Sequence, residues 1–567
     1  QIANDRGSEL SSDVDSARST ADLDPQPMSQ TTQPKQAIWD EADLLEFARG
    51  SIAKVFGADY AIIDSYDRRV RLPMPPYLLV SRVTQLDAHC GQFQPCSLTT
   101  EFDIPANARY SVDGQISWAV AVESGQCDLL LISYLGIDFE NQGNLVYRLL
   151  DCTLTFLADL PKEGETLRYD IKINSFVRNG SNLLFFFSYE CFVGEKMVLK
   201  MDGGCAGFFT DEQLAQGKGV IFSAKELQAQ SQIHKQQFEP LLICQKSKFD
   251  RTDLLHLGSG NLAACFGNHY WQGTRNPSLR LPQSDFLMLD RIVSIDPNGG
   301  NWGLGLIVGE QQLHPDDWYF PCHFKDDRVM AGSLMAEGCG QLLQVYMLYL
   351  GLQTCTTDAR FQPIPGLGQV VRCRGQVTPM SALLTYRMEI TAIGFNPQPF
   401  VRCNVAIILH DKTIVHFQDL GLQLCEKSPQ PSLDPAQLAA LAPRLADRPR
   451  QPALLNEDRI TEFCTGELAK CFGPEYAIYD RGTVKASRMP NTHLNLVHRI
   501  LSVEGQRYQI AKGSAIVTEY DVPLAPWYYR HNSSPTIPYA ILMEMALQPC
   551  GFLSAYLGTT LMFPELS

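Results

Sequence analysis

Apolar residues recur at helical spacing in residues 332–351, and no proline interrupts the run for about five turns at roughly 1.5 Å per residue. Glu337 and Gln341 are four residues apart and therefore share one face of this helix. The packed remainder is apolar and contains Leu342, Val345, Met347 and Leu348. Two further helical stretches, which close at Gly136 and Gly558, also end in Tyr-Leu-Gly with a glutamine ten residues before the glycine. The pattern predicts three long helices.

Alternating apolar and polar residues follow the first two helices and predict β-strands. The apolar faces of these strands are Leu167, Tyr169, Ile171 and Ile173 in the first case, and Leu384, Tyr386, Met388 and Ile390 in the second. Asn179-Gly180 lies between two such strands and is typical of a hairpin turn. Long helices together with antiparallel strands predict an α+β fold class.

The same unit recurs three times along the chain. A Phe-Gly-x-x-Tyr turn ends at Tyr60, Tyr270 and Tyr476, and each turn is followed by a proline and an arginine nine residues apart. We interpret both motifs as structural, because neither brings paired titratable groups together. The third copy stops at Ser567, soon after its helix, so we expect its sheet to be incomplete and a fourth copy to follow in a parent protein.

Two polar stretches mark the boundaries of these units. Residues 1–38 are rich in Ser, Asp, Gln, Thr and Pro and predict a disordered linker. The proline-rich stretch 426–455 predicts a linker between domains. Repeat 1 would then span residues 39–245, repeat 2 residues 246–425, and the truncated repeat 3 residues 456–567.

The composition is that of a soluble globular protein, with 45% hydrophobic and 19% charged residues. No apolar run reaches the roughly 18 residues needed to cross a bilayer, and we expect a cytoplasmic fragment of a larger protein. The net charge of -15 argues against nucleic acid or an anionic membrane as the main partner. The seventeen cysteines include no Cys-x-x-Cys pair, which indicates reduced core thiols rather than a disulfide framework or a zinc site.

The strongest chemical signal lies directly before the helix of repeat 2. His323 stands in an irregular segment, and the helix begins near Gly332 within Ala331-Gly332-Ser333. The first N–H groups of a helix lack partners inside the helix and carry its positive dipole end. The segment therefore predicts a place where a carbonyl oxygen is bound and polarised.

This segment resembles the active-site segment of the β-hydroxyacyl-ACP dehydratases of the β-hydroxydecanoyl type. The matching positions are His323, Phe324, Asp327, Val329, Met330, Gly332, Glu337 and Gln341. Arg328 and Ala331 stand where that family usually has proline, and Glu337 where it usually has aspartate. The resemblance implies a hot-dog fold, in which an antiparallel sheet wraps a long helix.

The repeats narrow the resemblance to the tandem dehydratase region of bacterial polyunsaturated fatty acid synthases. Repeats 1 and 2 would form a double hot-dog, and repeat 3 would be the start of a second. Repeat 3 carries His531 and the pair Glu544 and Gln548 but lacks the Phe-x-x-Asp signature, so we expect it to be inactive here.

The resemblance also implies that a histidine of one unit meets a carboxylate on the helix of the other. His323 would then meet an acid of the repeat 1 helix, whereas residues 106–115, which precede that helix, contain no histidine. Repeats 1 and 2 are therefore expected to hold one working site. Counting back from Gln126 places Val122 at the acid position, and a one-residue deletion would instead place Glu123 there.

The remaining acids and polar residues complete the expected site. Asp128 is ranked slightly above Glu123 as the partner of His323, because an acid within Cys-Asp-Leu-Leu-Leu predicts a raised pKa. Glu337 has the right place in the motif but would fall in the pocket without a histidine. Gly332, Gln126 and Gln341 are expected to bind substrate.

These residues predict a 3-hydroxyacyl-[acyl-carrier-protein] dehydratase, a lyase that converts (3R)-hydroxyacyl thioesters to trans-2-enoyl thioesters. His323 would act as base, the carboxylic acid would protonate the departing hydroxyl, and no metal, nucleotide or other cofactor is expected. The expected partners are an acyl carrier protein with phosphopantetheine-linked chains and other synthase domains. A trans-2 to cis-3 isomerase activity, a hot-dog thioesterase and a noncatalytic carrier-docking scaffold remain as alternatives.

Overall fold

A computed structural model describes residues 37–428 and 452–563, apart from 181, 483, 524–525 and 530–535. The disordered linker predicted at 1–38 lies almost wholly outside the described residues. So do most of the linker predicted at 426–455 and His531. None of the helices in the described ranges is long and apolar enough to cross a membrane.

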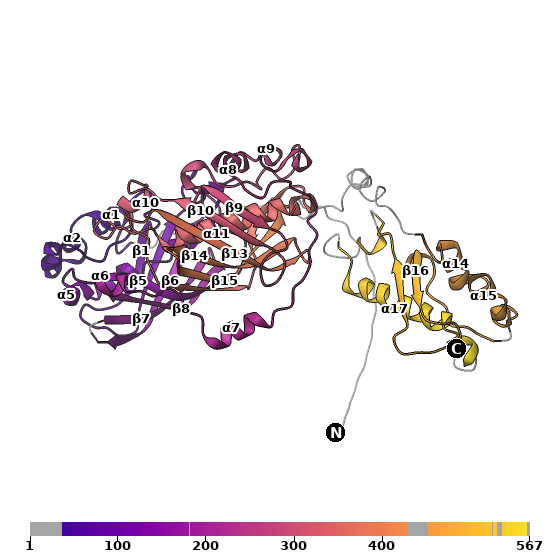
Figure 1. Cartoon of the computed structure of the whole chain (residues 1–567). Helices are drawn as coiled ribbons and strands as arrows, with labels where there is room; N and C mark the ends of the chain where they lie inside the picture. The colour runs from indigo at the N-terminus through magenta and orange to yellow at the C-terminus, as the bar shows by residue number, and fades with distance from the viewer. Residues whose placement is uncertain are drawn as a thin grey trace, which may run out of the picture.

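The first unit runs from short helices through a helical centre into four long strands (Figure 1). Its elements are α1 (Glu41–Arg49), α2 (Ile52–Phe56), η1 (Ala58–Ser65), β1 (Arg82–Asp87), β2 (Cys96–Asp103), β3 (Ser111–Val112), β4 (Gln115–Ile116), α3 (Trp118–Glu123), α4 (Asp128–Tyr134), α5 (Ile137–Asn141), β5 (Val146–Phe156), β6 (Thr166–Asn179), β7 (Asn182–Val193) and β8 (Lys196–Phe209). Two short helices, α6 (Asp211–Ala215) and α7 (Ala224–Ser231), then lead to the second unit.

The second unit repeats this order around one continuous helix. Its elements are α8 (Arg251–Gly258), α9 (Leu262–Phe266), η2 (Asn268–Tyr270), η3 (Ser284–Phe286), β9 (Arg291–Asp296), β10 (Leu306–Gln312), α10 (Tyr319–Cys322), α11 (Gly332–Tyr349), η4 (Leu352–Cys355), β11 (Ala359–Pro363), β12 (Gly368–Cys373), β13 (Leu383–Gly394), β14 (Phe400–Leu409) and β15 (Lys412–Glu426).

The third unit begins with the same order of elements. These are α14 (Glu457–Thr465), α15 (Leu468–Phe472), η5 (Pro474–Tyr476), α16 (Ala477–Asp480), η6 (Thr492–Leu494), β16 (Arg499–Glu504), β17 (Ala515–Glu519), η7 (Trp527–Tyr529), α17 (Tyr539–Tyr556) and α18 (Thr559–Met562). On α17 the apolar side chains of Leu542, Met543 and Leu547 are about half exposed. Within the described residues, therefore, this helix is less completely covered than α11.

Each unit starts from the same helix cap and the same packed turn. The side chains of Asp40, Asp250 and Asn456 accept backbone N–H groups at the starts of α1, α8 and α14, which is a favourable N-cap arrangement. The turn tyrosines then donate their hydroxyls to backbone carbonyls near the ends of the central helices: Tyr60 to Tyr134, Tyr270 to Tyr349, and Tyr476 to Ala555. The structural interpretation of the Phe-Gly-x-x-Tyr turn is confirmed.

The first two units share one antiparallel sheet of thirteen strands. Its order is β1-β2-β6-β7-β8-β5-β12-β15-β14-β13-β10-β9, with β11 paired to β15. The two halves join where β5 pairs with β12, with Thr155 opposite Gly368 and Asp151 opposite Arg372. The alternating residues predicted to face inward are all buried, and Asn179 pairs with Asn182 across the predicted hairpin turn.

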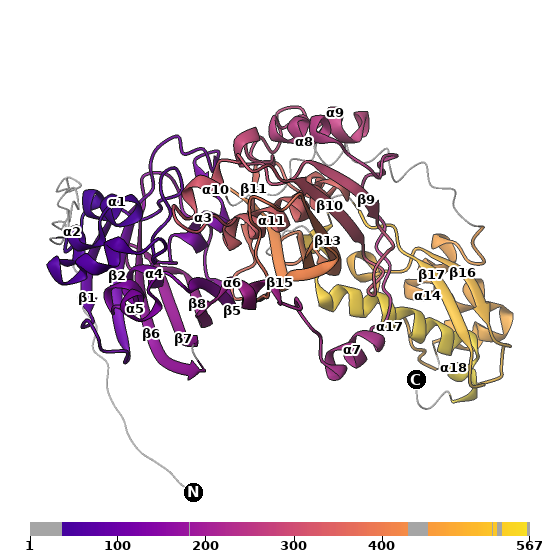
Figure 2. The same ribbon diagram turned by 60° about the vertical axis from the view of Figure 1, so that its left-hand side comes forward.

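Helix α11 is the centre of the second half. Nearly all of its eighteen residues are buried, and it packs against β10, β13, β14 and β15 (Figure 2). Gly338 allows the close approach to β13, because a Cβ there would lie 2.5 Å from the Tyr386 hydroxyl. Gly340 allows the approach to α3, because a Cβ there would lie 2.4 Å from the Trp118 indole nitrogen. The predicted fold class is confirmed: a long helix is wrapped by an antiparallel sheet.

The repeat 1 helix, predicted to run unbroken over 117–136, is instead divided into α3 and α4. The hydroxyls of Tyr169 and Tyr189 donate to the carbonyls of Ala121 and Val122 at the end of α3. The Val122 carbonyl also accepts the N–H of Gly125, a bond of three residues' span that replaces the α-helical one. A Cβ at Gly125 would also lie only 2.7 Å from the Tyr189 ring. Strand side chains therefore pack directly on the end of α3, where the helix is interrupted after Glu123.

Candidate active site

His323 is held at the end of a short helix that leads toward α11. Its N–H donates to the Tyr319 carbonyl, and its own carbonyl accepts the N–H of Val329. The ring nitrogen Nδ1 lies 3.0 Å from the Val329 carbonyl oxygen, so Nδ1 carries a hydrogen and Nε2 is left as the basic nitrogen. Burial lowers the pKa of His323 below its usual value, and the nearby Glu123 carboxylate opposes this effect. The ring is therefore neutral near pH 7.

Glu123 is the acid that faces this ring. Its Oε1 lies 3.7 Å from His323 Nε2, and both side chains are about one-tenth exposed. The two residues come from different units, because Glu123 ends α3 of repeat 1 whereas His323 precedes α11 of repeat 2. The expected pairing of one unit's histidine with the other unit's helix is thus present in the geometry.

The structure reverses the preference for Asp128 over Glu123. Asp128 is fully buried at the start of α4, and its Oδ2 accepts a hydrogen bond of 2.9 Å from the Tyr147 hydroxyl rather than contacting the histidine. Burial raises the pKa of Asp128 to about 7, against a smaller opposing effect of the tyrosine hydrogen bond. The raised pKa that was predicted from burial is therefore present, but the hydrogen-bond partner of this side chain is Tyr147 and not His323.

The first residues of the three central helices show which glutamates occupy equivalent positions in the three units. Glu123, Glu337 and Glu544 are each the sixth residue of their helices, α3, α11 and α17. Val122, the position found by counting back from Gln126, is one residue off. The count fails because repeat 1 is one residue shorter between its acid and its glutamine, at the break between α3 and α4.

A cavity of about 130 Å³ opens beside His323 and Glu123. Its polar end includes Gln126, Gly332 and Ser333 as well as these two residues. Its apolar end lies at the joint of the two half-sheets and is lined by Leu149, Cys152, Leu154, Met201, Val371, Val415 and Phe417. Such a cavity fits a ligand with one polar reacting group and a hydrocarbon tail.

Gly332 and Gln126 line this cavity, but Gln341 does not. Gly332 is the first residue of α11, and a Cβ built on it would meet no atom within 4 Å, so space remains at the helix start. The Gln341 amide instead accepts the N–H of Met288 and donates to the Phe286 carbonyl and to Glu337. The substrate-binding role predicted for Gln341 therefore has no support in the geometry, because its side chain is used to hold a backbone loop.

Two hydroxyl residues of the site carried no signal strong enough to be singled out from the sequence. The Ser333 hydroxyl donates to Glu123 Oε2 over 2.5 Å, and the Tyr77 hydroxyl lies 2.9 Å from Ser333 Oγ. Ser333 directly follows the motif glycine, which was a usable local clue. Tyr77 is 246 positions away from His323 in the sequence, and only the packing of repeat 1 on repeat 2 brings it close.

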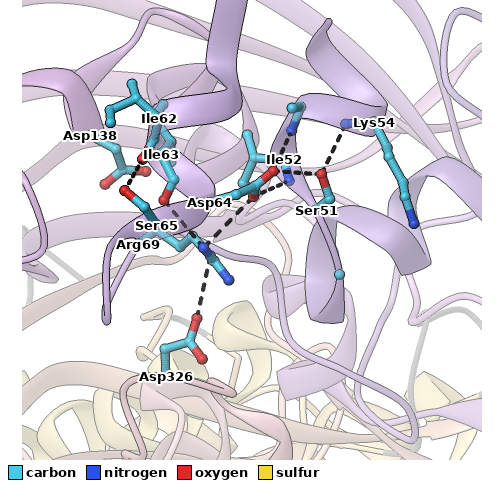
Figure 3. Close-up of polar contacts among 12 residues, drawn as sticks. Ser51, Ile52, Lys54, Ile62, Ile63, Asp64, Ser65, Arg69, Asp138 and Asp326 are labelled. Atoms are coloured by element: carbon cyan, nitrogen blue, oxygen red, sulfur yellow. Dashed lines mark hydrogen bonds and ion pairs between the residues drawn. The ribbon is translucent and has the colours of Figure 1, made fainter. Parts of the chain in front are cut away.

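Arginines of repeat 1 anchor the loop that carries His323. Asp326 pairs with the buried Arg71 at 2.6 Å and lies 3.7 Å from Arg69, which also contacts Asp64 (Figure 3). Asp327, the motif aspartate, forms a two-pronged ion pair with Arg148 at the cavity. Paired and largely buried ions of this kind fix geometry, because both partners lose hydration unless they meet.

A second, smaller pocket of about 50 Å³ occupies the equivalent place at the start of α3. Glu337 lines it and is buried, which raises the pKa of this carboxyl to about 7. Tyr110 precedes α3 and lines this pocket, as His323 precedes α11 and lines the first. Trp118, the first residue of α3, stands where α11 has Gly332 and reduces the space. Of these two pockets, the first combines the acid with a histidine and the second does not.

In the described part of the chain, no group of three or more His, Cys, Asp or Glu side chains is placed to hold a metal ion. The chemistry available at the first pocket is proton transfer between an imidazole and a carboxyl group. A helix start lies within reach to bind an oxygen that gains negative charge.

Comparison with known proteins gives a family match that includes the segment of His323 and α11. A family model described as a FabA-like domain matches residues 281–418. The chain is 36% identical over 650 residues to a polyunsaturated fatty acid synthase subunit of Thraustochytrium sp., a match that covers 94% of this chain and 43% of the relative. The chain thus spans less than half the length of this relative.

Solved structures with a similar arrangement are distant in sequence. The dehydratase domain from the CurJ module of Curacin polyketide synthase matches at 9% identity with a TM-score of 0.33, over 61% of this chain and 96% of that domain. A trans-AT PKS dehydratase domain from Brevibacillus brevis matches at 10% identity with a TM-score of 0.34, over 63% of this chain and all of that domain. His323, α11 and the strands β9 to β14 all lie inside residues 281–418, the part of the chain that is similar to the FabA-like family model.

Proposed function

We propose that the chain dehydrates (3R)-hydroxyacyl thioesters to trans-2-enoyl thioesters, on acyl chains held by an acyl carrier protein, in the synthesis of polyunsaturated fatty acids. The observation that carries the proposal is the 3.7 Å approach of His323 Nε2 to Glu123 Oε1 at the polar end of a cavity with an apolar tail. The FabA-like domain and the polyunsaturated fatty acid synthase relative support the same reaction and setting.

The elimination needs a base, an acid and a site for developing charge. His323 Nε2 takes the proton from the α-carbon, and the hydrogen bond of Nδ1 to the Val329 carbonyl holds the ring in the tautomer that allows this. The electron pair left on the α-carbon forms the double bond as the bond from the β-carbon to its hydroxyl oxygen breaks. Glu123 gives its proton to that oxygen, so water leaves instead of hydroxide.

The thioester oxygen gains negative charge as the α-proton is removed. The backbone N–H of Gly332 at the start of α11 is the group proposed to bind it, since the helix start offers free donors and a favourable dipole. After water leaves, His323 holds a proton and Glu123 has lost one. Their 3.7 Å separation lets the proton return to the carboxyl group and resets the site.

Removing the imidazole tests the proposal directly. Hydration of a crotonyl thioester, the reverse reaction, is measured for the wild-type chain, for His323→Ala and for His314→Ala, a matched control at an exposed histidine. We expect His323→Ala to lose about 10²- to 10⁴-fold in rate and the control to keep its activity.

Two results would contradict the dehydratase. Unchanged hydration in His323→Ala would favour a carrier-docking scaffold, because such a role needs no base. Release of free fatty acid from acyl thioesters, without formation of enoyl product, would favour a thioesterase in which Glu123 activates water.

A further inference from the structure

The carboxyl group of Glu123 is attached to a short chain of hydroxyl groups. Ser333, the second residue of α11, donates its hydroxyl hydrogen to Glu123 Oε2 over 2.5 Å. The hydroxyl of Tyr77 lies 2.9 Å from Ser333 Oγ. Ser333 and Tyr77 are both buried, with 7% and 1% of their surfaces exposed. The chain therefore runs from the interior of repeat 1 through repeat 2 and back to the acid of repeat 1.

Neither hydroxyl has a counterpart at the second pocket. Tyr77 lies four residues after Pro73 and Phe286 four residues after Pro282, so the equivalent of the tyrosine is a phenylalanine. The second residue of α3 is Ala119, where α11 has Ser333. The acid itself is kept, because Glu337 stands where α3 has Glu123, and it is held by the Gln341 amide and by Ser117, the residue before α3. The Ser333 and Tyr77 hydroxyls therefore belong to the pocket that contains His323.

The count of hydrogens decides which carboxyl oxygen carries the acidic proton. Ser333 has one hydroxyl hydrogen, and where it is donated to Glu123 Oε2 the hydrogen between Tyr77 and Ser333 comes from the tyrosine. Oε2 is then an acceptor, and a proton on the acid lies on Oε1. That oxygen is the one 3.7 Å from His323 Nε2 at the cavity.

We infer that Ser333 and Tyr77 are positioning residues that direct the proton of Glu123 onto the oxygen facing the substrate and His323. The inference rests on the proposed dehydration and extends it to two residues outside the histidine–acid pair. Without the Ser333 donor, the carboxyl group is free to rotate or to carry its proton on the oxygen that faces away. Both changes lower the fraction of acid that is ready to protonate the leaving hydroxyl.

The test combines Ser333→Ala, Tyr77→Phe and the conservative variant Ser333→Thr with pH profiles of kcat and KM. A hydroxyl donor to a carboxyl group favours its ionised form, so we expect the alkaline limb of the profile to move to higher pH when the Ser333 hydroxyl is removed. We expect kcat to fall roughly tenfold in Ser333→Ala with KM little changed, a smaller loss in Tyr77→Phe, and recovery in Ser333→Thr.

A structural control separates positioning from simple loss of stability. Tyr60→Phe removes another buried tyrosine hydrogen bond, to the Tyr134 carbonyl, outside the cavity lining. We expect it to lower the melting temperature and leave the pH profile unchanged. If Ser333→Ala and Tyr77→Phe also change only the melting temperature, the inference is wrong, and the proposed dehydration is unaffected by that result.

The imidazole gives a readout that does not depend on turnover. NMR titration of the His323 ring, assigned with His323→Ala, reports how the proton is shared with Glu123. In Ser333→Ala the carboxyl group that faces the ring has lost a hydrogen-bond donor, so we expect the titration of His323 to shift from that of the wild type. An unchanged titration would overturn the hydroxyl arrangement. Absence of any hydration or dehydration by the wild-type chain would overturn the proposed function instead.

Discussion

The two pockets made by repeats 1 and 2 contain the same kind of helix start and the same kind of acid, yet the side chains around the acid differ. The first combines Glu123 with His323, an open position at Gly332 and the Ser333 hydroxyl. The second combines Glu337 with Tyr110 and the bulk of Trp118. A carboxyl group at a helix start therefore does not by itself make a site for elimination, which also requires a base and space.

The difference in surroundings also changes what each acid does. Glu337 is held by the amide of Gln341, which in turn fastens the loop at Phe286 and Met288. Glu123 is held by a hydroxyl on one oxygen and faces the histidine with the other. One acid thus belongs to a packed structural network and the other is directed into a cavity.

The largest expected effect comes from neutralising each acid in turn. Glu123→Gln removes the proton donor and should lower the dehydration rate by about 10²- to 10⁴-fold, whereas Glu337→Gln should stay within roughly threefold of wild type. Steady-state rates on a 3-hydroxyacyl thioester would measure both. If Glu337→Gln lowers the rate more than Glu123→Gln does, the first pocket is not the site of the reaction.

Exchanging the residue at the helix start should give the next largest effect. Gly332→Trp places in the first pocket the side chain that the second has at Trp118, and we expect at least about a 100-fold loss of activity from displaced substrate. Gly332→Ala adds only a methyl group into open space and should lose much less.

Melting temperatures serve as the control for this exchange. Both glycine variants should stay folded, because the added atoms enter the cavity rather than the core. Full activity in Gly332→Trp would mean that substrate does not approach this helix start.

The smallest expected effect is on stability and concerns Asp128. The corresponding part of α11 carries leucines, Leu342 and Leu343, in place of this acid. Its pKa of about 7 means that the folded chain keeps this proton while the unfolded chain loses it near pH 4. Folding therefore takes up a proton at Asp128. The free energy of unfolding falls as the pH rises from about 4 to about 7, because the unfolded chain then gives up this proton more easily than the folded chain.

The amide in Asp128→Asn cannot ionise, so this variant should not lose stability as the pH rises. We expect the variant to gain on the order of 2 kcal/mol relative to wild type between pH 5 and pH 8, measured by denaturant unfolding, while the exposed Asp67→Asn shows no such trend. A constant difference across this range would mean that Asp128 is ionised in the folded chain.

The central helices of the second and third units differ in how completely they are buried. Nearly all of α11 is buried under strands of its own repeat, whereas Leu542 and Leu547 of α17 are half exposed among the described residues. The same helical sequence pattern thus appears in both environments. Apolar periodicity reports which face can be buried, and the surrounding strands decide whether it is.

Sequence alone was enough to find the repeated unit, the strand faces such as Leu384 to Ile390, and His323 with Gly332 at the start of α11. These features are local, because period, turn residues and motif spacing are set by neighbours along the chain. The expectation that His323 meets a carboxyl group from repeat 1 came from the resemblance, and the geometry agrees with it.

Only the tertiary structure decided which carboxyl group that is. Asp128 carried the stronger local sign of a raised pKa, but Tyr169 and Tyr189 pack on the end of α3 and Asp128 is bonded to Tyr147. The end of α3 is in contact with strands 48 and 67 residues further along the chain, and no local pattern records them. For the same reason Tyr77 and Ser333, which come from different repeats, become neighbours only when the two half-sheets join.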